Sequence, residues 1–169
     1  MVMDPKQFRN ALGSFATGVT IITTRDGQGG AIGVTANSFN SLSLDPPLVL
    51  WSIGKKAFSF PAFSAAKHFA VHVLAADQQA LSDRFARPST EKFDGVEYAH
   101  GLGEVPLFPG CAAVFECTTD QFVDGGDHVI MIGRVERFTV NEEALPLMFF
   151  RGRYVIPEAG GIFSPPVKV

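Results

Sequence analysis

Short apolar and β-branched runs, separated by clusters of turn residues, recur along almost the whole chain and constrain its fold more than any other feature. Such runs, bounded by Gly, Pro, Asn or Asp, are typical of β-strands. Six or seven strands with little helix between them indicate a mainly β domain, and an antiparallel barrel, closed or half-closed, would remove exposed sheet edges. The expected strands are residues 18–24, 31–35, 48–52, 69–74, 111–122, 128–140 and 148–156.

Helical patterns are few and short, which places the helices at the periphery of this barrel. Asp4 followed by Pro5 is a typical helix start, and apolar residues follow it at helical spacing. Residues 57–66 have weak helical character. Residues 75–85 form the best helical pattern in the middle of the chain, with Asp77 as the expected N-cap.

The length of the chain, 169 residues, fits one globular domain, residues 1–169. We expect its core to span about residues 4–156 and residues 157–169 to form a C-terminal tail. Residues 86–109 are punctuated by Pro and Gly and are expected to be loop with one short strand.

The charge balance argues against nucleic-acid and membrane partners. The formal net charge is -3, the pI is about 5.8, and no cluster of Lys and Arg occurs. No apolar run approaches the roughly 20 residues that a membrane-spanning helix needs. The first ten residues are charged and do not resemble a signal peptide, so we expect a cytoplasmic protein.

The cysteines and two of the histidines do not predict a disulfide or a metal site. Cys111 and Cys117 lie six residues apart on an expected strand, too far apart in an extended segment to pair, so both are expected to be buried thiols. His68 and His72 have the spacing of a metal pair on a helix, but their segment has the pattern of a strand. We therefore expect no metal.

The most informative segment for function is residues 33–47, GVTANSFNSLSLDPP, where small hydroxyl and amide residues lie between two apolar runs. Such a loop can offer backbone N–H groups and Ser, Thr and Asn side chains to an anionic or polar heterocyclic ligand. The same composition also suits a turn that caps its own backbone. Composition alone leaves both interpretations open.

Polar groups at two strand ends are further candidates. Ser52, Lys55 and Lys56 lie where a strand passes into a helical pattern, which suits a phosphate, although two solvated lysines would have the same sequence. His128 follows two glycines in a hairpin turn and could approach a ligand, whereas a lone hairpin histidine is often structural or merely exposed.

Arg151 and Tyr154 near the C-terminus could contact a dinucleotide or lie on an ordinary strand edge. The chain lacks the G-x-G-x-x-G, P-loop and G-x-S-x-G motifs, so any nicotinamide would have to bind outside a Rossmann fold. It also contains 16 Phe against one Trp and two Tyr, an excess that suits a subunit interface or the pocket of a planar ligand.

Taken in order, several segments resemble the flavin reductase domain family, whose fold is the FMN-binding split barrel, an antiparallel barrel of Greek-key type. The family is typified by the reductase components of two-component flavin-dependent monooxygenases. The resemblance covers nearly the whole chain. It rests on FRNALGSFATGVTIITT, GVTANSFNSLSLDPPLVL, AFSFPAFSAAKHFAVHVL, LSDRFARPSTEKFDG, GDHVIMIGRV and FFRGRY.

The resemblance implies a set of flavin-binding residues and a nicotinamide side. His128 is the candidate catalytic residue and would face the nicotinamide, with Arg151 and Tyr154 on the same side. The flavin phosphate would lie near Ser52, Lys55 and Lys56, although SIGKKAFS departs here from the Asn or Asp followed by Ser that the family often has. The other flavin contacts would be Thr35, Ala36, Asn37, Ser38, Ser41, Ser43, Arg84, Phe85, Ala86, Lys92 and Phe93.

The activity that the resemblance implies is NAD(P)H:flavin oxidoreductase, which reduces FAD or FMN by hydride transfer and supplies a partner monooxygenase. FAD and NADH are the favoured ligands, and a homodimer with flavin sites at its interface is expected. Two alternatives remain, because one fold hosts many functions. They are a non-enzymatic flavin- or haem-binding protein and a flavoprotein reductase of another cofactor, such as a corrinoid.

Overall fold

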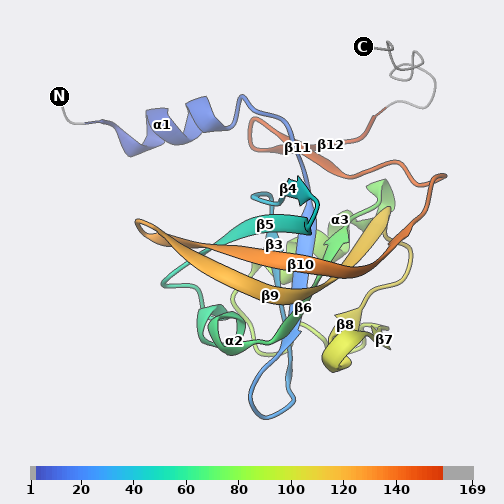
Figure 1. The fold of residues 1–169 in the computed structure, drawn as a ribbon. Helices are drawn as coiled ribbons and strands as arrows, with labels where there is room; N and C mark the ends of the chain where they lie inside the picture. The colour runs from blue at the N-terminus through green and yellow to red at the C-terminus, as the bar shows by residue number, and fades with distance from the viewer. Residues whose placement is uncertain (1–2, 158–169) are drawn as a thin grey trace.

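A curved antiparallel sheet of seven strands forms the body of the protein in the computed structural model, which describes residues 3–157 (Figure 1). Every neighbouring pair in this sheet is antiparallel. The predicted mainly β antiparallel barrel is therefore confirmed. In spatial order the strands are β3 (Ala31–Ala36), β2 (Thr20–Arg25), β6 (His68–Val73), β9 (Ala113–Gly125), β10 (His128–Val140), β5 (Pro47–Gly54) and β4 (Asn40–Leu44).

The barrel is split between its first and last strands, β3 and β4, which follow one another in the sequence. No ladder of backbone hydrogen bonds joins these two strands among residues 3–157. Instead, β3 comes close to β5, and the hydroxyl of Ser38 bonds to the backbone of Ser52 across the opening. A side chain thus completes one side of the barrel where main-chain pairing stops.

Short strands outside the main sheet form two further sheets. β1 (Thr17–Gly18), β11 (Met148–Phe150) and β12 (Arg153–Val155) form a three-stranded sheet in the order β1-β11-β12. β7 (Ala99–His100) pairs with β8 (Pro106–Leu107), so residues 86–109 contain two short strands and not the single one expected.

The expectation of one strand over residues 148–156 is wrong. The chain reverses at Arg151 and Gly152, whose φ angles are 49° and 78°. Two successive residues in the left-handed region form a tight turn, so the segment becomes the β11–β12 hairpin.

The helices lie at the periphery, as predicted. α1 (Pro5–Leu12) begins after Asp4, whose carboxylate accepts a hydrogen bond from the N–H of Lys6. α2 (Phe60–Ala65) precedes β6, and α3 (Gln79–Ala86) follows it. Two single 3₁₀ turns are also present, η1 (Ala76–Gln78) and η2 (Leu102–Glu104).

The expected N-cap of α3 is wrong. Asp77 lies within η1, and Gln78 occupies the N-cap position without a side-chain capping bond. The side chain of Gln78 instead accepts a hydrogen bond from the N–H of Ala75, which orders the 3₁₀ turn before the helix.

Strand β4 was not expected, because it lies inside the hydroxyl-rich segment interpreted as a loop. Four of its five residues are exposed, since it is an edge strand paired only with β5. A strand with no buried face lacks the alternation of apolar and polar residues by which strands are recognised.

The core of the barrel is divided into two clusters. One is centred on Trp51, whose ring packs edge-on against Phe63 and Phe69. The other includes Phe85 of α3, whose ring lies where a side chain on Gly33 would stand, 2.6 Å from the ideal Cβ position. The absence of a Cβ at Gly33 therefore allows α3 to pack closely on β3.

The cysteine prediction is confirmed, because Cys111 and Cys117 are both free and buried. Burial raises the pKa of Cys111 to about 11 and that of Cys117 to about 12. Among residues 3–157 no helix is long and apolar enough to cross a membrane. The predicted tail is outside the described residues except for Pro157.

Candidate functional site

A small pocket of about 200 Å³ opens at the end of β3, where the sequence predicts ligand contacts. We call it the β3 pocket. It brings together three consecutive predicted flavin residues and parts of α3 and the β11–β12 hairpin. Its lining residues are Val19, Thr35, Ala36, Asn37, Ser82, Ala86, Phe149 and Tyr154.

Hydrogen bonds between distant elements fix the walls of the β3 pocket. The hydroxyl of Thr35 donates to the carbonyl oxygen of Ser82 at 2.7 Å. The Tyr154 hydroxyl donates to the Asp83 carboxylate at 2.9 Å, and its oxygen lies 2.9 Å from the Ser82 hydroxyl. Because the only Tyr154 hydroxyl proton is used on Asp83, the Ser82 hydroxyl is the donor in that pair.

The Tyr154 hydroxyl stays protonated in this setting. Burial raises its pKa above the usual value, and the neighbouring Asp83 acts in the same direction, although the bond from Ser82 opposes both. Tyr154 therefore acts as a neutral hydrogen-bonding group that joins β12 to α3.

A second and larger pocket, of about 830 Å³, lies between α1 and the β11–β12 hairpin, and we call it the α1 hollow. It shares Asn37 and Phe149 with the β3 pocket, so the two pockets adjoin at these residues. Its volume is within the range of small-molecule sites, roughly 300 to 1,000 Å³. The other lining residues are Arg9, Asn10, Leu12, Gly13, Ser14, Phe15, Thr17, Arg151 and Gly152.

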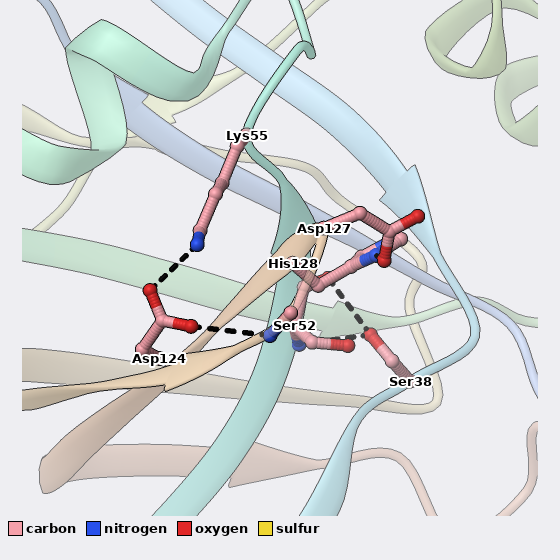
Figure 2. Close-up of polar contacts among 7 residues, drawn as sticks. Ser38, Ser52, Lys55, Asp124, Asp127 and His128 are labelled. Carbon is pink, nitrogen blue, oxygen red and sulfur yellow. Dashed lines mark hydrogen bonds and ion pairs between the residues drawn. The ribbon is translucent and has the colours of Figure 1, made fainter.

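A polar cluster lies next to Ser38, the last residue of the Thr35–Ser38 segment, at the corner of β5 and β10 (Figure 2). The Ser38 hydroxyl donates to the Ser52 carbonyl oxygen at 3.0 Å and accepts from the Ser52 N–H at 2.9 Å. The register pairs His128 with Gly54, two residues beyond Ser52. The predicted residues Ser38, Ser52 and His128 are thus brought to one corner.

Two carboxylates contact the basic side chains of this corner, Lys55 and His128 (Figure 2). Lys55 Nζ lies 2.6 Å from Asp124 Oδ2, and His128 Nδ1 lies 2.7 Å from Asp127 Oδ1. The hydrogen bond from Lys55 lowers the pKa of Asp124, and that from His128 lowers the pKa of Asp127. Both carboxylates are therefore ionised near neutral pH and can orient the Lys55 and His128 side chains.

Two predicted cations, Arg84 of α3 and Lys92 after it, bond to the backbone of the protein. Lys92 Nζ donates to the carbonyl oxygens of Gly33 at 3.0 Å and Phe85 at 2.9 Å, and burial lowers its pKa. Arg84 donates to the carbonyl oxygens of Glu91 and Asp94. These side chains tie the segment after α3 to the barrel, and Phe93 packs edge-on against Phe85.

Some predicted contacts lie apart from both pockets. Ser41 and Ser43 are on the edge strand β4, and Lys56 is exposed; none of them lines the β3 pocket or the α1 hollow. Within this single chain, His128 lies at the corner of β5 and β10, whereas Arg151 lines the α1 hollow and Tyr154 lines the β3 pocket. The common nicotinamide side of these three residues stays a prediction.

Sequence reasoning missed Ser82, Asp83 and Phe149 as site residues. Ser82 is fully buried although it is a serine on a helix, and its partner Tyr154 is 72 residues away. The nearest local signal was the segment FFRGRY, which contains Phe149 and Tyr154.

The pocket residues fit a planar, polar heterocycle such as a flavin. Within residues 3–157 the exposed Asn37 amide, which borders both pockets, makes no side-chain hydrogen bond. Phe149 and Tyr154 add aromatic surface. Unused polar groups beside aromatic rings are typical of ligand sites.

A split antiparallel barrel of this topology places the chain in the class of split-barrel proteins. The flavin reductase like domain model matches residues 12–157, and the chain belongs to this family.

Two curated relatives and one solved structure illustrate the family. The reductase component of the flavin-dependent trigonelline monooxygenase of Acinetobacter baylyi is 47% identical over 152 residues, covering 90% of this chain and 49% of that protein. FMN reductase (NADH) SmoA of Agrobacterium fabrum is 48% identical over 149 residues, covering 88% of this chain and 84% of SmoA. NADH:FAD oxidoreductase SgcE6 of Streptomyces globisporus, solved with NAD and FAD fragments, is 37% identical with a TM-score of 0.87, covering 96% of this chain and 99% of SgcE6.

The relatives differ in length. The chain spans about half of the Acinetobacter protein and of a probable flavin reductase of Rhizobium meliloti, but most of SmoA.

Proposed function

We propose that this protein is an NAD(P)H:flavin oxidoreductase that reduces FAD or FMN by hydride transfer and supplies the reduced flavin to a partner monooxygenase. The observation that carries the proposal is that the β3 pocket and the α1 hollow lie side by side and share Asn37 and Phe149 as lining residues. Hydride transfer between two ring systems needs adjoining space for both, and the two pockets adjoin. The names of SmoA and SgcE6 support the same activity.

A bound flavin and nicotinamide supply the hydride chemistry, and the protein supplies binding, orientation and electrostatics. Thr35, Ala36 and Asn37 would hold the flavin ring, since they line the β3 pocket. Their backbone N–H groups and the Asn37 amide are suited to stabilise negative charge on a heterocycle. The aromatic side of the site would be formed by Phe149 and Tyr154.

The corner of β5 and β10 would hold a phosphate and position a proton. Lys55, oriented by Asp124, supplies the positive charge, with Ser52 and Lys56 nearby in the sequence. His128, held by Asp127, would orient the nicotinamide or buffer a proton at Nε2. No covalent role is assigned to it.

Steady-state oxidation of NADH and NADPH with riboflavin, FMN and FAD in turn tests the proposal. We expect flavin-dependent oxidation with at least one combination of nucleotide and flavin. The relative rates of the six combinations show which nucleotide and which flavin the protein prefers. Binding of flavin without any oxidation of either nucleotide would contradict the proposal and favour a flavin-binding protein. Flavin that remains stoichiometric after dialysis would indicate a prosthetic group and a different acceptor.

We further propose a homodimer and a partner oxygenase. All residues of α1 are exposed, and Phe8 and Leu12 are 49% and 59% exposed, so this helix offers apolar surface to a second copy. Relatives named as reductase components of monooxygenases support the oxygenase partner. Sedimentation equilibrium tests the dimer, and a monomer at micromolar concentration would refute it. The cytoplasmic location stays a prediction.

A further inference from the structure

Three hydroxyl groups line the β3 pocket, and each of them uses its proton inside the protein. The Thr35 hydroxyl donates to the carbonyl oxygen of Ser82 at 2.7 Å. The Tyr154 hydroxyl donates to the Asp83 carboxylate at 2.9 Å, and the Ser82 hydroxyl donates to the Tyr154 oxygen, 2.9 Å away. A hydroxyl group carries a single proton, so none of the three has a donor left for a ligand.

Asp83 determines the direction of this chain of hydrogen bonds. An ionised carboxylate can only accept, so the Tyr154 hydroxyl points its proton at Asp83 while its oxygen accepts the proton of Ser82. Asp83 belongs to α3 and is half-buried, and it does not line the β3 pocket itself. Its effect on the pocket therefore passes through Tyr154, which does line it.

The wall formed by Thr35, Ser82 and Tyr154, which we call the hydroxyl wall, consequently offers acceptors and no donors. Thr35 Oγ1 accepts no hydrogen bond from the residues that the structure describes, so its lone pairs are available to a ligand. Ser82 is fully buried, and Thr35 and Tyr154 are half-buried, which limits the competition from water. A ligand that fits this wall must bring an N–H or O–H group to it.

The isoalloxazine ring of a flavin carries one such group on its polar edge. This group is the imide N–H at N3, which lies between two carbonyl groups. Those carbonyl groups need donors, and the Asn37 amide, which also lines the β3 pocket, can supply one. Riboflavin, FMN and FAD share this edge and differ only at the far end of the ribityl chain. The hydroxyl wall therefore suits the ring that all three flavins have in common.

We propose that Asp83 is a positioning residue that, through Tyr154, keeps the hydroxyl wall of the β3 pocket an acceptor for the N3–H group of the flavin ring. This inference rests on the proposed function and deepens it, because it names the edge of the ring that the protein recognises. An amide at position 83 could donate to the Tyr154 oxygen and turn the Tyr154 proton toward Ser82 or the pocket. The wall would then present a donor to the N3–H group.

Quenching of flavin fluorescence by the purified full chain tests this arrangement, with riboflavin and 3-methylriboflavin as the two probes. They differ only by a methyl group in place of the N3 hydrogen, and neither carries a phosphate. We expect wild type to bind riboflavin about tenfold more tightly than 3-methylriboflavin. Asp83→Asn should raise the Kd for riboflavin about fivefold and leave that for 3-methylriboflavin within about twofold. A merely structural role of Asp83 would raise both Kd values by the same factor.

A double-mutant cycle tests whether Asp83 acts through Tyr154. In the Tyr154→Phe background, Asp83→Asn should change the Kd for riboflavin by less than about twofold, because the hydroxyl that transmits its effect is absent. Asp77→Asn is the matched control, since Asp77 is an exposed aspartate just before α3 that lines neither the β3 pocket nor the α1 hollow. It should change neither Kd. Circular dichroism checks that each variant is folded.

Three results would overturn the inference. Equal Kd values of the two flavins for wild type would show that N3–H does not face an acceptor, and this comparison needs no variant. Equal factors for the two flavins in Asp83→Asn would reduce Asp83 to a structural role. A full effect of Asp83→Asn in the absence of the Tyr154 hydroxyl would show that Asp83 acts by another route.

Failure of the proposed function has a different signature. Wild-type protein would then oxidise neither NADH nor NADPH with any flavin, even where it discriminates between riboflavin and 3-methylriboflavin.

Discussion

The hydroxyl group of Ser38 bonds to both backbone polar groups of Ser52, accepting from its N–H at 2.9 Å and donating to its carbonyl at 3.0 Å. This pair spans the split of the barrel and joins the Thr35–Ser38 segment to β5. Ser38 and Ser52 were both predicted as flavin contacts, but their mutual bond gives them a structural role as well. Together they set the position of the residues that line the β3 pocket.

Replacement of Ser38 by Ala should therefore destabilise the fold by roughly 1 to 3 kcal/mol, because two half-buried backbone groups lose their partner. Urea unfolding measures the change. Ser64→Ala is the matched control, since the Ser64 hydroxyl makes one exposed bond, to the carbonyl of Pro61. Equal unfolding free energies for the two variants would contradict the structural role.

Tyr154→Phe should weaken flavin binding several-fold and destabilise the protein by about 1 kcal/mol, because the Asp83 carboxylate loses a donor and buried Ser82 loses an acceptor. Fluorescence quenching of FMN and FAD gives the affinities. Tyr98→Phe removes the same atom from a tyrosine outside the β3 pocket and should leave them unchanged. If both variants bind flavin like the wild type, the Tyr154 hydroxyl does not shape the site.

His128→Ala should raise KM for NADH and slow flavin reduction while flavin affinity is retained, because His128 would orient the nicotinamide. The change should be modest, since no covalent step is assigned to this side chain. Asp127→Asn should have a smaller effect in the same direction, because it removes the carboxylate 2.7 Å from Nδ1. NADH kinetics identical to wild type in His128→Ala would exclude His128 from the site.

Buried His72 should make the stability of the fold depend on pH. Its Nδ1 lies 3.0 Å from the carbonyl oxygen of Ile21, its Nε2 has no partner among residues 3–157, and burial lowers its pKa from 6.5 to about 4. The unfolded chain therefore takes up a proton first as pH falls. The contribution of neutral His72 is complete above about pH 6.5 and is lost progressively down to about pH 4.

The loss is on the order of 3 kcal/mol, because each unit of pKa shift corresponds to about 1.4 kcal/mol. Urea unfolding of wild type and His72→Phe at pH 7.5 and pH 4.5 separates this contribution from the titration of carboxylates, which both proteins share. Wild type should lose more stability than His72→Phe between the two pH values. An equal loss in the two proteins would show that folding does not lower the pKa of His72.

The strands that sequence predicted well are those with one buried face and clear turn residues at their ends. Both ends of β10 were predicted correctly, as His128–Val140, since two glycines precede it and its apolar pattern continues to Val140. β4 was missed because both of its faces are largely exposed, and the β11–β12 hairpin was missed because a non-glycine residue, Arg151, adopts a positive φ at its turn.

Five of the residues that line the β3 pocket were named from the sequence, namely Thr35, Ala36, Asn37, Ala86 and Tyr154, but only the first three are consecutive, so that no local pattern could show the last two beside them. Thr35, Ala36 and Asn37 line the β3 pocket together as the sequence suggested. The approach of Tyr154 to Ser82 depends on packing between elements 72 residues apart, which no local pattern encodes. The same is true of Arg9 and Arg151, which line the α1 hollow together and are brought near each other by the bond between Arg151 N–H and the carbonyl oxygen of Gly13.

The absence of a side chain at Gly33 keeps the β3 pocket narrow, because it lets α3 lie close to β3. The Phe85 ring occupies the volume that even a methyl group on residue 33 would need, and Phe85 lies on the same helix as Ser82 and Ala86, which line the pocket. Any larger residue at position 33 would push this helix outward and widen the opening between it and β3. Gly33 thus determines the width of the β3 pocket although it is not among the residues that line it.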